Sequence, residues 1–593
     1  MQPRYATFAE AIVRVAEEHP KMGFVFQDMA GEETFYSYPQ VAEETERRAA
    51  ALQQMGLTKG DRVGLIVVEP EAFVLNFLAA IRAGVIPVPL YPPLSFGALD
   101  AYAERTARVL ELSGTKVLIA SSKLQNVLWG LVDQVPCLQK LIRAEDVTGE
   151  GLAKPTLPDI SPQDVAFLQY TSGSTADPKG VIVTHASLCA NCHVILDIGL
   201  EVNGAKGDVT VSWLPLYHDM GLIGFVLSTL YVGLKSVLIP TMRFIKKPTV
   251  WFDAIHKHRG VVSFAPNFAY ALITRKAKPE QLAQWDLSSM RAFGCGAEPI
   301  HPDVMRTFND TFGTHSKLNA TAVMPAYGMA EATLAMCFKP LGRTFGTRVV
   351  DAVSYQQDGV VRAPVPGGPT FEHVSCGPVF PHHEMSVKAE DGTVLPEGHE
   401  GELCFKGPSV AAGYFENPEA TAATFKDGWL HTGDLGYILD GEVYVTGRLK
   451  DLIILNGRNV HPQAIEWRAA EVDGVRKGNV VAFARPGANS EELVVVCEVS
   501  SDDHDRIKAE VARVVRQEIG VGPADVVCLA PGSLPKTSSG KLQRRKTRSQ
   551  YILNALGADG VRTMGSSGST LTVARHLAKG LWSRAKARLA STL

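Results

Sequence analysis

Residues 170–180 read YTSGSTADPKG, a run of small and hydroxyl-bearing residues that closes on Lys179 and Gly180. Such a loop offers closely spaced backbone N–H groups and hydroxyl donors, which suit a polyphosphate. It does not fit a Walker P-loop, because no Gly-Lys pair closes a G-x-x-x-x-G-K-[ST] frame. On composition alone a Ser/Gly-rich surface turn is the commoner interpretation. The loop therefore indicates a phosphate site only if other segments support it.

Strands and helices alternate on the N-terminal side of this loop. Short β-rich runs at 63–68 and 85–90 follow helical patterns at 39–55 and 72–83. This alternation is typical of βα units around a largely parallel sheet. The first half is therefore predicted to be α/β.

The C-terminal side divides into three parts. Between 341 and 372 regular periodicity fades into Gly, Pro, Val and Thr, which indicates an insertion or an extended loop. Short segments with turn signals then predict a β-rich subdomain that ends near Gly447. A new α+β pattern follows, with a helix expected near 461–472 and strands near 479–485 and 492–499. The predicted domains are therefore an N-terminal domain (1–447), a small mobile C-terminal domain (448–556, hinge 448–451) and a linker with a basic amphipathic tail (557–593).

Composition fits an ordinary globular chain. Of 593 residues, 46% are hydrophobic and 20% charged, enough apolar surface to offset the conformational entropy of folding. Nine scattered cysteines without a signal-peptide pattern favour a reducing, cytoplasmic setting. The apolar run at 220–234 is bounded by Asp219 and Lys235 and falls short of the roughly 18 residues that a membrane span needs. We expect it to be buried core.

Charge is uneven along the chain. From Lys536 to the end, twelve Lys and Arg face one acid, Asp559, so this end carries +11 while the whole chain carries −3. A basic end is suited to phosphates, an acidic protein or a membrane surface. Nucleic acid is not expected, because aromatic and basic residues do not interleave there. Within 571–589 an apolar stripe with basic flanks allows weak docking to a membrane surface or partner, and equally a mobile tail or packing on the protein itself.

Five further segments carry chemically suggestive residues. An aromatic face beside a hard carboxylate, as in YGMAEAT at 327–333, suits a nucleotide that carries a hard cation. A carboxylate such as Asp434 can accept both hydroxyls of a ribose. Any one acid is more often a solvated surface group, but the ordered set is not expected by accident. The other segments are GCGAEP (294–299), TGD (432–434), GRLKD (447–451) and PKTSSGKLQRR (535–545).

In this order the motifs resemble the adenylate-forming superfamily of acyl-CoA synthetases, luciferases and peptide-synthetase adenylation domains, over nearly the whole chain to about Tyr551. The resemblance implies ATP as co-substrate, Mg²⁺ held by Thr171 and Glu331, and a catalytic lysine, Lys541, on a loop expected to face solvent. It also implies a hinge at Lys450. The implied nucleotide-binding residues are Thr171, Ser172, Gly173, Ser174, Thr175, Lys179, Gly296, Ala297, Glu298, Tyr327, Gly328, Met329, Ala330, Asp434, Arg448 and Lys541.

Other segments resemble the fatty acyl-AMP ligases within that superfamily. These are WLPLYHDMGLIG (213–224), APNFAY (265–270), Tyr91-Pro92-Pro93 and residues 296–300, and 341–372 falls where that family has an insertion. His218 would be an aromatic gate between tunnel and nucleotide pocket rather than a metal ligand, because no second His or Cys lies at ligand spacing. The implied acyl-binding residues are Trp213, His218, Asp219, Met220, Gly221, Asn267 and Phe268.

The resemblance predicts a fatty acyl-AMP ligase. Such an enzyme activates a fatty acid with ATP and passes the acyl group to the phosphopantetheine thiol of an acyl carrier protein, for which the basic residues Arg544, Arg545, Lys546 and Arg548 are candidate contacts. A fatty acyl-CoA synthetase that uses CoA, an amino-acid adenylation module and a non-catalytic relative remain alternatives. Retention of Lys541 disfavours the last. The C-x-x-C-H pattern at 189–193 is not expected to bind haem, because its cysteines would share one buried helix face.

Overall fold

The largest sheet has eight strands in the order β14-β13-β12-β11-β9-β10-β1-β2. The computed structural model describes residues 2–93, 99–171, 178–202, 204–455, 458–487, 491–537 and 540–557. All interior pairs of this sheet are parallel, and only the edge pairs β1–β2 and β13–β14 are antiparallel. The strands are β14 (Ala335–Phe338), β13 (Val323–Gly328), β12 (Ala292–Cys295), β11 (Val262–Ala265), β9 (Val209–Ser212), β10 (Lys235–Leu238), β1 (Gly23–Gln27) and β2 (Glu33–Ser37).

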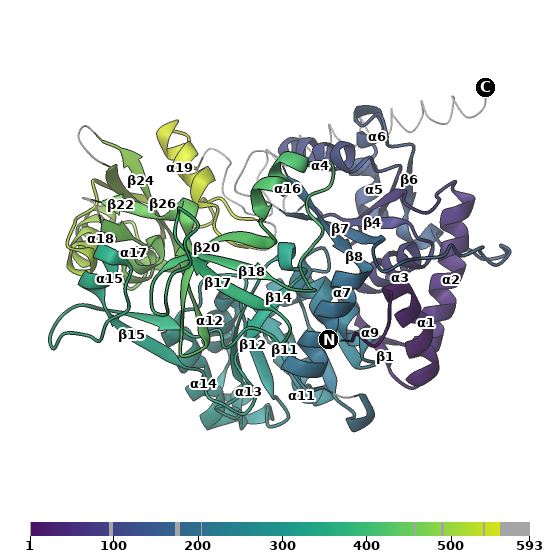
Figure 1. The fold of residues 1–593 in the computed structure, drawn as a ribbon, viewed down its shortest axis with the longest axis horizontal. Coiled ribbons are helices and arrows are strands. Elements are labelled where there is room, and N and C mark those ends of the chain that lie inside the picture. The colour runs from purple at the N-terminus through teal and green to yellow at the C-terminus, as the bar shows by residue number, and fades with distance from the viewer. Residues whose placement is uncertain are drawn as a thin grey trace.

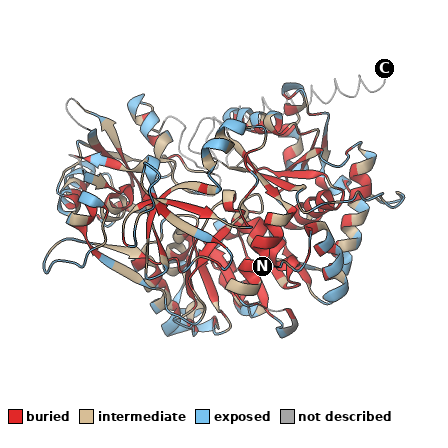
Figure 2. Ribbon diagram, viewed as in Figure 1, coloured by how far each residue is buried: buried red, intermediate tan, exposed pale blue. Residues whose placement is uncertain are grey.

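A second, fully parallel sheet is built by the N-terminal βα units. Its order is β4 (Ile86–Pro89), β3 (Arg62–Ile66), β5 (Val117–Ala120) and β6 (Lys140–Arg143). Helices α2 (Tyr38–Gln54) and α3 (Pro70–Arg82) lie where helical periodicity predicted them. Most strand residues of the two sheets are buried, as Figure 2 shows, whereas the edge strands β2 and β6 are more exposed. The predicted α/β class is confirmed.

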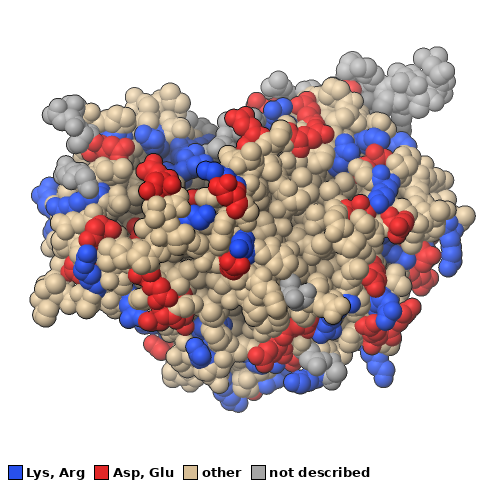
Figure 3. Space-filling view, viewed as in Figure 1, with Lys and Arg blue, Asp and Glu red and all other residues tan. Residues whose placement is uncertain are grey.

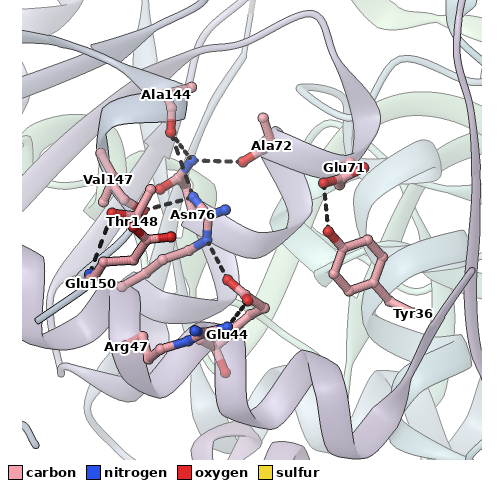
Figure 4. Close-up of polar contacts among 12 residues, drawn as sticks. Tyr36, Glu44, Arg47, Glu71, Ala72, Asn76, Ala144, Val147, Thr148 and Glu150 are labelled. Atoms are coloured by element: carbon pink, nitrogen blue, oxygen red, sulfur yellow. Dashed lines mark hydrogen bonds and ion pairs between the residues drawn. The ribbon is translucent and has the colours of Figure 1, made fainter. Parts of the chain in front are cut away.

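Side-chain hydrogen bonds attach the segment after β6, at residues 144–147, to α2 and α3. The Asn76 amide on α3 donates to Ala72 O at 2.8 Å and to Ala144 O at 3.3 Å, as Figure 4 shows. Arg48 on α2 donates from Nη1 to Val147 O at 2.8 Å. Since buried carbonyls need donors, these side chains replace the hydrogen bonds that an irregular loop lacks.

The β-rich subdomain is a five-stranded antiparallel sheet, as its turn signals predicted. Its strands are β17 (Glu384–Lys388), β18 (Gly401–Lys406), β20 (Trp429–Leu439), β19 (Phe425–Lys426) and β21 (Glu442–Arg448), with β20 paired to both β18 and β21. It packs beside β14 near the centre of Figure 1. The last residue of β21 is therefore the first residue of the predicted hinge.

The segment 341–372 is not one extended loop, which corrects that part of the expectation. It contains β15 (Thr347–Asp351), α15 (Ala352–Asp358) and the start of β16 (Thr370–Val374), with β15 and β16 antiparallel. The Asp351 carboxylate caps α15 by accepting from Ser354 N at 2.8 Å. Helix α15 contacts β23 (Arg458–Val460), and β16 contacts β21. These elements are short, so their hydrophobic periodicity is too brief to stand out in the sequence.

A separate core forms the C-terminal part. All of its fully buried members lie between Ile453 and Val526. The helix expected near 461–472 is α17 (Pro462–Ala469), and the expected strands are parts of longer β24 (Val475–Pro486) and β25 (Glu491–Val499). The remaining elements are β22 (Ile453–Leu455), α18 (His504–Ile519), β26 (Asp525–Leu529) and α19 (Arg544–Ile552). A single turn, η7 (Leu449–Asp451), joins this core to β21.

The remaining expectations concern burial and surface. The run 220–234 is buried, as predicted, and no helix among the described residues is long and apolar enough to cross a membrane. Cys189 and Cys192 are both buried on α7 (His185–Cys192), as expected. On the face in Figure 3 basic and acidic residues are interspersed. The tail expected at 571–589 lies outside the described residues.

Candidate functional site

The phosphate-loop motif sits on a β-hairpin. Strand β7 (Val165–Thr171) pairs with β8 (Lys179–Thr184), and Thr171 lies opposite Lys179. A Cβ on Gly180 would lie 2.7 Å from the Tyr170 ring, so glycine is required for the pairing. The hairpin thus holds the two ends of the loop next to each other. The predicted residues Ser172, Gly173, Ser174 and Thr175 lie outside the described residues.

The motifs proposed for adenine and ribose meet through one hydrogen bond. Tyr327, near the end of β13, donates from its hydroxyl to Asp434 Oδ2 at 2.8 Å. Arg448, opposite Asp434 in the β20–β21 pair, has its Nε 3.3 Å from Oδ1. Burial raises the pKa of Asp434, which Arg448 and the Tyr327 hydroxyl oppose. The carboxylate is therefore oriented by two donors from two other strands.

Glu331 lies one turn after β13, in η6 (Ala330–Ala332). Its Oε1 accepts from the Tyr414 hydroxyl at 2.7 Å, and burial raises the pKa of the carboxyl. The Lys179 ammonium lies 4.7 Å from the centre of the Tyr414 ring. Tyr414 thereby connects the predicted metal ligand to the end of the phosphate loop.

The segment 296–298, which follows β12, forms one wall of the candidate site. Gly296 is buried, and Ala297 takes a left-handed conformation with φ 68°. Glu298 Oε1 accepts from Phe268 N at 2.9 Å, and burial raises the pKa of its carboxyl. This contact ties the wall to α12 (Asn267–Lys276), which carries two of the predicted acyl-binding residues.

Lys541 reaches this site from the small domain and does not face solvent, which corrects the expectation for its loop. Its side chain is half-buried, and burial lowers the pKa of its ammonium. The charges of Asp219, Glu298 and Asp434 raise the pKa of this ammonium, and the charge of Arg448 lowers it further. A Cβ on the neighbouring Gly540 would lie 3.8 Å from the Phe268 ring.

The predicted acyl-binding residues lie next to this wall. Trp213 is buried and stacks on Phe244 with 3.6 Å between ring centres, and Phe268 meets it edge-on. The ring of His218 contacts the Asp219 carboxylate through Nδ1. Burial alone would raise the pKa of Asp219, but the His218 imidazole holds it below its usual range.

Comparison with known sequences identifies this arrangement. The sequence model described as "AMP-binding enzyme" matches residues 12–415, more than half of the chain. The chain belongs to the AMP-binding enzyme family.

Relatives cover most of the chain. A Caulobacter vibrioides protein named provisionally as an acyl-CoA synthetase is 38% identical over 88% of this chain and 91% of its own length. A 4-hydroxyphenylalkanoate adenylyltransferase of Mycobacterium marinum is 33% identical over 83% of this chain and 82% of its own length. A solved structure from a study of fatty acyl-adenylate ligases of E. coli and L. pneumophila superposes with a TM-score of 0.88 at 34% identity, covering 93% of this chain and 98% of that chain.

The hinge region corrects one expectation for this family member. Lys450 is exposed in η7, but its neighbour Asp451 accepts from Arg544 Nη1 at 2.6 Å. Arg544 also donates to Glu466 at 2.8 Å, and its side chain is only 17% exposed. Arg544 is therefore engaged in ion pairs within the small domain. The prediction that it contacts an acidic carrier protein is wrong.

Sequence reasoning missed two residues of the site. Tyr414 lies 83 positions from Glu331, and Glu402 fixes the ribose loop by accepting from Gly433 N at 3.0 Å across β18 and β20. Neither contact leaves a periodic signal, since each joins residues far apart in the chain. The alternation of polar and apolar residues along β18 was the one hint that Glu402 and Gly433 could face each other.

Proposed function

We propose that this enzyme joins a fatty-acid carboxylate to the α-phosphorus of ATP, releasing pyrophosphate and forming an acyl adenylate. A carboxylate oxygen forms the new bond to phosphorus as the bond to the pyrophosphate oxygen breaks. The observation that carries the proposal is the approach of the Lys541 loop to α12, where a Cβ on Gly540 would lie 3.8 Å from the Phe268 ring. A fixed ammonium there can neutralise negative charge that develops between carboxylate and α-phosphate.

Side chains in the site suit the two ends of ATP. Asp434, held by Tyr327 and Arg448, has oxygens that can accept from the ribose hydroxyls. Lys179 closes the loop that would cradle the phosphates. In-line displacement at phosphorus requires no covalent bond between protein and substrate. Positioning and charge neutralisation by these groups would therefore supply most of the catalysis.

The donor chemistry also fits Mg²⁺. Glu331 offers a half-buried carboxylate whose Oε1 accepts from Tyr414, and Thr171 adds a hydroxyl from the end of β7. Hard oxygen donors of this kind are what Mg²⁺ takes. When bound, the ion would neutralise charge on the phosphate oxygens. Tyr414 keeps the Glu331 carboxylate turned into the site.

An aliphatic acid is the substrate best supported. The fatty acyl-adenylate ligase neighbour covers 93% of this chain, and the segments after β9 and β11 offer the apolar side chains of Trp213, Met220 and Phe268. An amino-acid substrate would need a free buried acid to pair with its amine. Asp219 is the nearest candidate, and it is occupied by His218 and by Met220 N at 2.7 Å.

We further propose that the acceptor is the phosphopantetheine thiol of an acyl carrier protein, which attacks the acyl carbonyl and releases AMP. The support is the folded 341–372 segment. The Tyr355 hydroxyl of α15 donates to Glu400 Oε1 at 2.6 Å, and His461 of the small domain lies 3.1 Å from the same oxygen. Contacts on both sides of the hinge would restrict the small-domain movement that CoA entry requires.

A fatty acyl-CoA synthetase is the second candidate. The Caulobacter relative carries that provisional name, and the adenylation half-reaction would be identical. The two functions differ only in the thiol that completes the reaction, so a direct product assay separates them.

The test is an incubation of purified protein with ATP, Mg²⁺ and a panel of fatty acids, with and without CoA, followed by mass spectrometry of the products. Pyrophosphate release with accumulation of acyl-AMP, and little acyl-CoA in excess CoA, is the expected result. A cognate carrier protein should become acylated. Rapid acyl-CoA formation would overturn the carrier proposal, and failure to release pyrophosphate with every acid would overturn adenylation itself.

A matched pair of variants tests the role of the insertion. Tyr355→Phe removes the hydroxyl that joins α15 to Glu400, whereas Tyr444→Phe removes a hydroxyl from the adjacent β21 without touching the hinge contact. Only the first should raise acyl-CoA formation. Equal acyl-CoA yields from both variants and the unaltered protein would refute the tether.

A further inference from the structure

Three side chains of types that can bind a metal converge on one face of the β-rich sheet, and one of them, Glu402, is the residue that also accepts from Gly433 N. Glu402 and Cys404 are two residues apart on β18, so they point to the same face. His431 on β20 lies directly opposite Cys404 in the strand register. Their donor atoms all lie within 4.8 Å of one another. Among the residues that the structure describes, no other set of three such side chains comes this close.

The contacts within the cluster leave it free to rearrange around an ion. His431 Nδ1 is 2.8 Å from Glu402 Oε2 and 3.5 Å from Cys404 Sγ. The other ring nitrogen, Nε2, is buried and has no hydrogen-bond partner within the described part of the chain. A ligand at Nδ1 would replace the contacts of this nitrogen with Glu402 and Cys404 and place the ring proton on Nε2.

Two ammonium groups lie on the same face: Lys388 is opposite Glu402 in the strand register, and Lys406 follows Cys404 by two positions. Lys388 and Lys406 lie over the Trp429 ring at 5.0 and 4.9 Å from its centre. Lys406 also pairs with Glu384 at 3.0 Å. The two ammonium groups thus contact Trp429 and Glu384. The carboxylate of Glu402 contacts His431 and Gly433 instead.

We propose that Glu402, Cys404 and His431 bind one thiophilic divalent metal ion, of which Zn²⁺ is the best match. Sulfur, imidazole nitrogen and carboxylate oxygen are the donors that Zn²⁺ takes in tetrahedral sites, and a water completes three protein ligands. A thiolate ligand favours Zn²⁺ over Mg²⁺, because Mg²⁺ prefers sites made only of oxygen donors. Cys404 gives up its thiol proton to solvent as the metal–sulfur bond forms, and the His431 proton moves to Nε2.

The position of the site gives it a consequence for catalysis. The carboxylate that would bind the ion through Oε2 is the one that holds Gly433 N through Oε1. Gly433 has φ 68° and precedes Asp434, whose own N–H donates to Thr432 Oγ1 at 3.0 Å. Turning Glu402 toward an ion shifts this loop. The metal therefore acts as an inhibitor that raises KM for ATP more than it lowers kcat.

Cobalt provides the direct test, because a tetrahedral Co²⁺–thiolate bond gives a sulfur-to-metal charge-transfer band. The full chain, titrated with Co²⁺ in the presence of Mg²⁺, should develop this band with one equivalent and lose it on addition of Zn²⁺. Cys404→Ser should abolish the band. His431→Gln should weaken Zn²⁺ affinity by more than about tenfold. Cys137→Ser, which removes a half-buried thiol from the turn before β6, should change nothing.

Steady-state pyrophosphate release gives an independent readout. Sub-stoichiometric to equimolar Zn²⁺ should raise KM for ATP in the unaltered protein and in Cys137→Ser, but not in Cys404→Ser. Absence of a charge-transfer band in the unaltered chain, or its persistence in Cys404→Ser, overturns the proposal. So does equal Zn²⁺ inhibition of all variants.

Discussion

Replacing Tyr327 by Phe removes one hydroxyl and keeps the ring that would stack on adenine. The lost contact is the 2.8 Å hydrogen bond to Asp434, and both residues are less than 10% exposed. A hydrogen bond to a charged group contributes about 1.5–3 kcal/mol. Asp434 keeps Arg448 as its remaining donor at 3.3 Å, so we expect a loss at the lower end of that range, about 1.5 kcal/mol. The carboxylate would be free to rotate away from the ribose.

The expected result is a rise of about tenfold in KM for ATP, which corresponds to about 1.4 kcal/mol, with a smaller change in kcat. The assay is pyrophosphate release at varied ATP and, in parallel, at varied 2′-deoxy-ATP. If Asp434 accepts from the ribose hydroxyls, the variant should discriminate less between the two nucleotides. Tyr437→Phe, which removes a buried hydroxyl from the same strand as Asp434, is the control. Unchanged KM and unchanged discrimination in Tyr327→Phe would refute the assignment of the ribose site.

Three further outcomes are expected. Lys541→Ala should lower pyrophosphate release by at least about a hundredfold while the circular dichroism spectrum is retained, since losing one preorganised charge-stabilising group costs roughly that much; a rate within threefold of the unaltered enzyme would contradict this. Glu331→Gln should shift the Mg²⁺ titration to higher concentration, because an amide is a poorer ligand for a hard cation, and an unchanged titration would count against a metal role. Burial alone would raise the pKa of Glu400, but His461 and other donors lower it from 4.5 to about 2. A depressed pKa means that stability is present above pH 4.5 and lost toward pH 2, so thermal melting should fall across that window in the unaltered protein and stay flatter in Glu400→Gln.

The α/β class was readable from the sequence because long helices and buried strands repeat their periods many times. Helix α2 is 17 residues long and begins with a capping box at Ser37, so both its existence and its start leave local signals. Helix α15 is 7 residues long and lies between Asp351 and Gly359. Its formation depends on packing against β23 and on the buried Tyr355, neither of which a local pattern contains.

The same distinction between local sequence signals and long-range contacts applies to the candidate site. Motifs that are contiguous in the chain, such as those around Thr171, Glu331 and Asp434, could be picked out from residue type and order. Contacts between distant residues could not. Tyr414, which contacts Glu331, lies in the connection between β18 and β19. Arg544 was a candidate for a basic surface, but in the structure it is a largely buried ion-pair partner of Asp451 and Glu466.

Glu400 shows why the acceptor question depends on the fold rather than on any motif. One buried carboxylate accepts from Tyr355 of the insertion and from Thr446 of β21, and it lies next to His461 of the small domain. Moving the small domain would separate His461 from Glu400 and leave a buried charge with fewer partners, a change that costs more than breaking an exposed ion pair. The position that brings Lys541 to the proposed nucleotide site is therefore stabilised by contacts of Glu400, one of which, from Tyr355, an enzyme without the 341–372 segment would lack. A carrier-bound thiol at the end of a flexible arm needs only a narrow opening, whereas CoA must also seat its nucleotide, so the same contacts weigh more heavily against CoA.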